Sequence, residues 1–289
     1  MIHWRHRNEQ ETVVPSADIE TTAFDTMWFG DANFPLSEEV FAALLEGGDK
    51  HVFVMPTTLR RAQVAPAHRY GHYDPRLSRA NTHWRDVDAV ELARQVIADH
   101  EKWDFGTPWV FSNEISYSQW RAQAIEEYRR WTVTFAQTLA EGGLLPALYS
   151  PMARPRAERN EWSALAVSGY VAIEGYLDAA MVLAARDPVG YSAGQYADIR
   201  SHFEAQGVAV DRCILVEHYS QTPATTKWGR GGLSLDDWLN VIAARIAGAR
   251  KAGFALLGSY GWGYNRMGVT DNEIVETARA YVAASDECL

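Results

Sequence analysis

The stretch PWVFSNEIS, residues 108–116, indicates how the chain is built. It reads as a short buried strand that ends on Asn113-Glu114, and a long helical pattern follows it. Two later stretches repeat this design, YVAIEGY at 170–176 and RCILVEHY at 212–219. Three apolar runs that each stop at a glutamate predict strands of one parallel sheet, in which all the carboxyl ends meet at the same edge.

Strand-like and helical patterns alternate along the rest of the chain. Residues 57–85 read as a long irregular loop, and the helix before the strand at 213–217 reads as 195–205. Further apolar runs of strand length occur at 21–29, 51–55, 144–149 and 254–259. This order predicts an α/β fold, a (β/α)8 TIM barrel, as a single domain over residues 1–289 with an irregular or shortened first βα unit.

The overall composition narrows the classes of partner. The 289 residues carry a formal net charge of -10, which argues against binding to nucleic acid or to an anionic membrane surface. Two cysteines do not make a disulfide framework, and neither a signal peptide nor a membrane-spanning run is visible. We therefore expect a cytoplasmic protein with a small-molecule or oligosaccharide substrate. A secreted form and any oligomeric state stay open.

The chemistry of a barrel enzyme is expected at the C-terminal ends of its strands. Two carboxylates in unequal surroundings can serve there as proton donor and as ionised partner, and aromatic rings with polar groups suit stacking on sugars. No glycine motif of the dinucleotide-binding type follows an early strand, which favours a closed barrel over a doubly wound open sheet. No cofactor is expected. The residues expected at this end are Asp25, Trp28, Asn113, Glu114, Glu174, Tyr176, Glu217, His218, Tyr219, Tyr260 and Trp262.

Four of these residues carry a resemblance to a known group of enzymes. Asn113-Glu114 at one strand end, Glu217 three strands later and Trp262 after the next strand are similar to the pattern of the clan A (β/α)8 glycoside hydrolases. The resemblance implies Glu114 as acid/base, Glu217 as nucleophile of a retaining reaction, and no metal. It also implies that Asn113 holds the sugar 2-hydroxyl, that Trp262 forms a floor for the sugar, and that Tyr176 steadies the nucleophile.

Other readings of the same residues stay open. The carboxylate of Glu174 is not part of the clan A pattern, and Glu217 could instead form an ion pair with a loop arginine such as Arg230. Asp25, Glu174, Glu217 and His218 could together hold Mg²⁺ or Mn²⁺, which would make the protein a metal-dependent isomerase, lyase or hydrolase. A barrel that binds carbohydrate or a protein partner without catalysis is the third alternative.

Overall fold

The computed structural model describes residues 26–29, 38–46, 71–73, 87–102, 108–112, 126–150, 161–219, 227–260 and 269–287. Seven strands in this part of the chain form one sheet in the order β1-β7-β6-β5-β4-β3-β2, and every pair is parallel. The strands are β1 (Thr26–Phe29), β2 (Gly71–Tyr73), β3 (Trp109–Ser112), β4 (Leu145–Ser150), β5 (Tyr170–Glu174), β6 (Cys213–His218) and β7 (Leu256–Tyr260).

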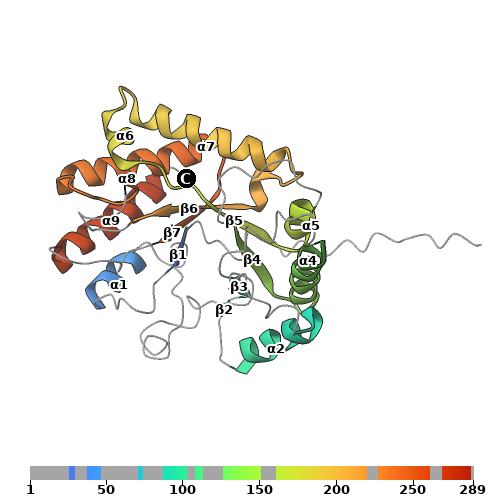
Figure 1. Cartoon of the computed structure of the whole chain (residues 1–289). Coiled ribbons are helices and arrows are strands. Elements are labelled where there is room, and N and C mark those ends of the chain that lie inside the picture. The colour runs from blue at the N-terminus through green and yellow to red at the C-terminus, as the bar shows by residue number, and fades with distance from the viewer. Residues whose placement is uncertain are drawn as a thin grey trace, which may run out of the picture.

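Helices follow the strands and lie on the outside of the sheet (Figure 1). Their bounds are α1 (Glu38–Leu45), α2 (Ala89–Lys102), α4 (Glu126–Glu141), α5 (Glu161–Ser168), α6 (Ala179–Ala184), α7 (Pro188–Glu204), the 3₁₀ turn η7 (Val210–Arg212), α8 (Leu235–Lys251) and α9 (Asp271–Glu287). Among these described helices, none is both long enough and apolar enough to cross a lipid bilayer.

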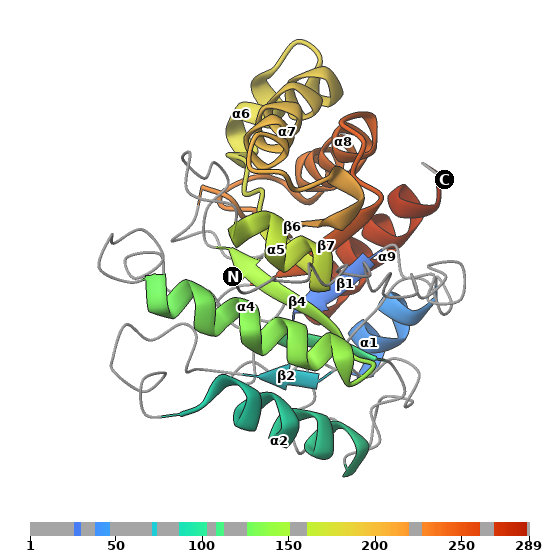
Figure 2. The ribbon, with the colours of Figure 1, turned by 90° about the vertical axis from the view of Figure 1, so that its right-hand side faces the viewer.

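The sheet curls so that its strand β1 lies beside its strand β7, as a second view also shows (Figure 2). Strand β1 pairs with β7, and α1 packs against α9. Arg279 of α9 makes an ion pair with Glu46 at the end of α1, with Nη2 and Oε1 2.9 Å apart. The alternation of parallel strands and outer helices makes the fold a (β/α)8 barrel. The strand expected at 51–55 lies outside the described residues.

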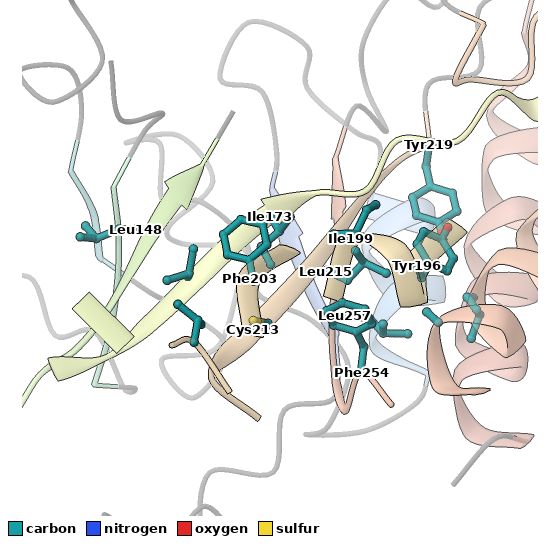
Figure 3. Packing of buried hydrophobic residues seen from close by; sticks show 14 of the residues in the cluster. Leu148, Ile173, Tyr196, Ile199, Phe203, Cys213, Leu215, Tyr219, Phe254 and Leu257 are labelled. Atoms are coloured by element: carbon teal, nitrogen blue, oxygen red, sulfur yellow. The ribbon is translucent and has the colours of Figure 1, made fainter. Parts of the chain in front are cut away.

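Side chains from the two faces of the sheet form two separate apolar layers. The helix-facing layer contains residues such as Leu148, Ile173 and Leu215, and the last two lie beside Phe203 and Ile199 of α7 (Figure 3). The interior layer consists of Trp109, Phe111, Ala147, Tyr149, Tyr170, Ala172, Ile214, Val216 and Leu256. Because both faces are buried, the strands read as almost continuous apolar runs in the sequence.

Several predicted elements are confirmed and two are wrong. The strand at 170–174 is β5, and the helix at 235–251 is α8. The stretch 57–85 is not irregular throughout, because β2 lies within it and pairs with β3. The helix expected at 195–205 begins earlier, at Pro188, where the Asp187 carboxylate accepts a 2.9 Å bond from the Gly190 N–H. Two glycines, at 190 and 194, weaken the helical pattern there.

Two neighbouring positions of α5 test the helix-facing layer. Leu165 is 1% exposed, whereas Val167 on the same helix is 74% exposed. Leu165→Ala should lower the free energy of unfolding by about 2 to 5 kcal/mol, because it removes buried methyl groups and leaves a cavity. Val167→Ala should change it by less than about 0.5 kcal/mol. Urea unfolding followed by circular dichroism measures both values, and equal losses would contradict the described packing.

Candidate functional site

The C-terminal end of β6 sends neighbouring side chains in opposite directions. Val216 belongs to the interior layer and Leu215 to the helix-facing layer. Since side chains alternate along a strand, Glu217 falls on the helix side and His218 on the interior side. Both are 4% exposed. Two adjacent residues that the sequence assigned to one site therefore lie in different surroundings.

Glu217 lies in a closed polar network between β6 and the helices. The Tyr196 hydroxyl of α7 donates to Glu217 Oε1, and Nη1 of Arg245 on α8 lies 3.4 Å from Oε2. The backbone N–H of His218 donates to Oε2 at 3.3 Å, and the Leu177 N–H also donates to the carboxylate. Every partner is supplied by the protein, as expected for a carboxylate taken out of water.

The charges of this network are set by burial. Burial raises the pKa of Glu217 to about 7, against the opposing effects of the Arg245 guanidinium, the Tyr196 hydroxyl and the two backbone N–H groups. Burial and the neighbouring carboxylate raise the pKa of the Tyr196 hydroxyl well above its usual range. The hydroxyl therefore keeps its proton and remains a donor, while the fully buried Arg245 favours an ionised Glu217.

The placement of Glu217 corrects the sequence prediction. A nucleophile must face the substrate, but this carboxylate faces α7 and α8 and is engaged by Arg245. Glu217 does form an ion pair, as the alternative interpretation expected, but its partner is Arg245 and not Arg230. Arg230 instead pairs with Glu273 of α9, with Nη1 and Oε1 2.8 Å apart.

Tyr219 is also placed differently from the prediction. Its side chain is 1% exposed and joins the helix-facing layer. Its ring centroid lies 6.2 Å from that of Trp238 on α8 and 5.0 Å from that of Tyr281 on α9. We assigned it to substrate binding from its position after a strand, but it is a core residue that fastens two helices to β6.

On the interior side, four rings gather at the C-terminal ends of β4, β5 and β6. We call Tyr149, Tyr176, His218 and Trp228 the aromatic cluster. The hydroxyls of Tyr149 and Tyr176 are 2.7 Å apart and share a hydrogen bond. The Tyr176 ring lies 5.3 Å from His218 and 5.5 Å from Trp228, measured between centroids. Tyr176 and Trp228 are half-buried, so neither residue is fully enclosed by the protein.

Glu174 brings a carboxylate to the same end of the barrel. It is the last residue of β5 and is half-buried. Ala172, two residues earlier, belongs to the interior layer, and Glu174 itself pairs in register with the interior residue Val216. Strand alternation therefore puts Glu174 on the interior side, with the aromatic cluster. That Glu174 and Tyr176 belong to one substrate site stays a prediction.

His218 is held in its neutral form. Burial, aided by the positive charge of Arg245, lowers the pKa of the imidazole to about 4. A neutral imidazole has one nitrogen that donates and one that accepts, so His218 can exchange hydrogen bonds with hydroxyl groups without carrying charge.

The remaining predicted residues are described in part or not at all. Trp28 lies in β1 opposite Ser259, and Tyr260 ends β7 opposite His218. Asp25, Asn113, Glu114 and Trp262 lie outside the described residues.

Trp228 is a member of the aromatic cluster that sequence reasoning missed. It precedes α8 in a stretch rich in glycine and basic residues, KWGRGG at 227–232, which reads as a solvated loop. The lone aromatic residue among glycines was the available signal, because a loop without core contacts rarely needs a tryptophan. Tyr149 is also absent from the predicted set, and its signal is an aromatic residue at the end of an apolar run.

The described part of the chain holds no group of three or more His, Cys, Asp or Glu side chains that could bind a metal ion. Of the four residues considered for a divalent cation, Glu217 and His218 lie on opposite faces of β6. Glu174 and His218 are the pair that shares the interior side.

Comparison with known proteins supports the fold. No model of a known protein family matches the chain, and no curated protein sequence matches it. Among solved structures, a GH5-4 broad specificity endoglucanase from an uncultured bacterium superposes with a TM-score of 0.55 at 11% identity, covering 92% of this chain and 95% of that chain. A D-psicose 3-epimerase from Clostridium cellulolyticum H10 gives a TM-score of 0.48 at 9% identity, covering 92% and 99%. At these identities the likeness concerns the barrel fold.

The buried imidazole predicts a pH effect on stability. Unfolded His218 binds a proton near pH 6.5, whereas the folded protein resists protonation until about pH 4. The stability that His218 contributes is therefore lost as the pH falls through this window, by about 3 kcal/mol in full. His218→Gln should flatten the decline in unfolding free energy between pH 6.5 and 4, as measured by urea titrations at stepped pH.

Glu217 acts in the opposite direction, because its raised pKa favours the folded state below pH 4.5 and this contribution is lost as the pH rises through about 7. Glu217 is present in both the wild type and the His218→Gln protein, so its effect on the unfolding free energy cancels when their pH profiles are compared. His202→Gln, at a half-buried position of α7, is the matched control and should leave the wild-type profile unchanged. A His218→Gln profile parallel to that of the wild type would contradict the buried neutral imidazole.

Proposed function

We propose that the protein is an enzyme that hydrolyses a glycosidic bond at the C-terminal end of its barrel. The observation that carries this proposal is the aromatic cluster with Glu174 beside it. The half-buried residues Tyr176 and Trp228 offer ring faces on which a sugar ring stacks. The Tyr149–Tyr176 hydroxyl pair and neutral His218 offer uncharged hydrogen-bonding partners for sugar hydroxyls.

Two carboxylates are required for this chemistry. Glu114, next to Asn113, is proposed as the general acid/base from the sequence pattern at its strand end. Glu174 is proposed as the second carboxylate in place of Glu217, because it lies on the interior side while Glu217 is engaged by Arg245 behind the strand. Trp28, Asp25, Tyr260 and Trp262 remain proposed contacts to the substrate.

The reaction needs the two carboxyl groups to differ in protonation. The general acid must hold a proton at neutral pH, and its partner must be ionised. A carboxyl separation of about 5 Å would give a covalent intermediate and retention, whereas roughly 6.5 to 9.5 Å would admit a water molecule and give inversion. The solved structure named a broad specificity endoglucanase shows that a barrel of this fold can house a hydrolase of this class.

Replacing the proposed carboxylates tests the assignment. Glu114→Gln and Glu174→Gln should each lower kcat by about 10² to 10⁴-fold, because each removes a group that transfers a proton or stabilises developing charge. The assay is release of nitrophenol from a panel of nitrophenyl glycosides, with reducing-sugar release from soluble glucans. Glu101→Gln, at an exposed end of α2, is the control and should keep wild-type turnover. Wild-type kcat in Glu174→Gln would refute the role given to this residue.

Chemical rescue distinguishes the two candidates for the second carboxylate. Azide should restore turnover at least tenfold in Glu174→Ala, because the anion can enter the space left on the side that binds substrate. It should have no effect on Glu217→Ala, whose truncated side chain faces α7 and α8. Rescue of Glu217→Ala alone would return the nucleophile role to Glu217.

A metal-dependent isomerase, lyase or hydrolase is the second candidate. It is favoured by one observation, that Glu174 and His218 share the interior side at the ends of neighbouring strands. Dialysis against EDTA followed by elemental analysis separates the two candidates. A glycosidase of the proposed kind keeps its turnover after chelation, whereas loss of turnover that Mn²⁺ or Mg²⁺ restores would favour the metal enzyme.

A further inference from the structure

Arg245 is a fully buried cation that lies behind the proposed site, outside the barrel interior. It projects from α8 toward the C-terminal end of β6. Its Nη1 donates to the His218 carbonyl at 3.2 Å, and its Nη2 donates to the Trp228 carbonyl at 2.8 Å and to the Leu177 carbonyl. The guanidinium also lies over the Trp238 ring, with Cζ 5.5 Å from the centroid. One side chain thus fastens three chain segments that are distant in sequence.

Each of these three carbonyls belongs to, or directly follows, a member of the aromatic cluster. His218 and Trp228 are held through their own carbonyls, and Leu177 is the residue after Tyr176. Because a planar guanidinium presents its donors in a fixed fork, it sets the relative positions of the groups it binds more tightly than an ammonium can.

Glu217 completes the arrangement as the counter-charge of Arg245. Its carboxylate accepts from the N–H groups of Leu177 and His218, while Arg245 binds the carbonyls of the same two residues. The Arg245–Glu217 ion pair therefore binds both the backbone N–H and the backbone carbonyl of Leu177 and of His218. The Tyr196 hydroxyl fixes the remaining carboxylate oxygen to α7.

A buried ion pair of this kind is expected to add little to the free energy of unfolding. Removing two charges from water costs several kcal/mol per ion, and a buried ion pair often gains little over apolar residues of the same volume. What the pair does provide is directional bonding at the C-terminal ends of β5 and β6 and at the segment before α8.

The geometry points to Arg245 as a positioning residue, with Glu217 as its counter-charge, that holds Tyr176, His218 and Trp228 in the arrangement that binds and turns over the substrate. The inference rests on the proposed function in one respect, since it takes the aromatic cluster as the substrate-binding surface. Arg245 itself touches no substrate and acts through the backbone of the three residues it orients.

Arg245→Lys tests this role while keeping the positive charge. Its single ammonium cannot reach all three carbonyls in the same geometry, so Trp228 should become more mobile and more accessible. The acrylamide quenching constant of Trp228, obtained as the difference between each protein and its Trp228→Phe counterpart, should rise at least twofold. The NMR signals of the His218 ring, assigned with His218→Gln, should shift. With a substrate that is turned over, kcat should fall about tenfold or more while KM changes less.

Arg200→Lys is the matched control. Arg200 on α7 also donates to a backbone carbonyl, that of Ala252 at 2.8 Å, but this residue follows the far end of α8. The Arg200→Lys substitution should leave the Trp228 quenching constant and the His218 NMR signals unchanged. If Arg245→Lys does not fold, Glu217→Gln, which keeps the side-chain volume and one acceptor oxygen, is measured by the same readouts and should disturb the same signals.

Wild-type Trp228 quenching and His218 signals in a folded Arg245→Lys or Glu217→Gln protein would overturn the positioning role, even if the free energy of unfolding fell. Disturbed signals without turnover of any glycoside by the wild type would retain the positioning role and reject the proposed function. Turnover that depends on Glu174, together with an undisturbed cluster in Arg245→Lys, would retain the function and reject the positioning role.

Discussion

The structure depends on the alternation of side chains in a curled parallel sheet. In strands β3 to β7, one face is toward the barrel interior and one toward the helices, and both faces contain buried residues. A polar residue near a strand end therefore belongs either to the interior, where the proposed substrate site lies, or to the helix layer, where its hydrogen bonds must come from the protein. Glu217 and His218 follow each other in the chain and illustrate the two outcomes.

The helix layer accepts charge at this place because the charge is balanced. Arg245 and Glu217 are both buried, and the Tyr196 hydroxyl and several backbone groups add further hydrogen bonds to this ion pair. The same positive charge helps to keep the nearby imidazole of His218 neutral. One ion pair behind the strand thus affects both the geometry and the protonation of the residues in front of it.

The functional conclusion rests on the interior side of the strands. Barrels of this fold support many chemistries, so the likeness to an endoglucanase at 11% identity defines the architecture and leaves the reaction to the residues. Half-buried aromatic residues, a shared tyrosine hydrogen bond and the half-buried Glu174 form a surface suited to a sugar ring.

The sequence by itself determined the barrel, since strand β5 and helix α8 have the bounds that periodicity and capping residues predict. It also placed Glu174 and Tyr176 at one strand end. The direction of Glu217 was decided only by the tertiary structure. An alternating pattern requires Glu217 and His218 to face opposite ways, but the preceding residues Leu215 and Val216 are both apolar. Nothing local distinguishes the interior from the helix side, and the choice is made by where Tyr196 and Arg245 arrive when the helices pack.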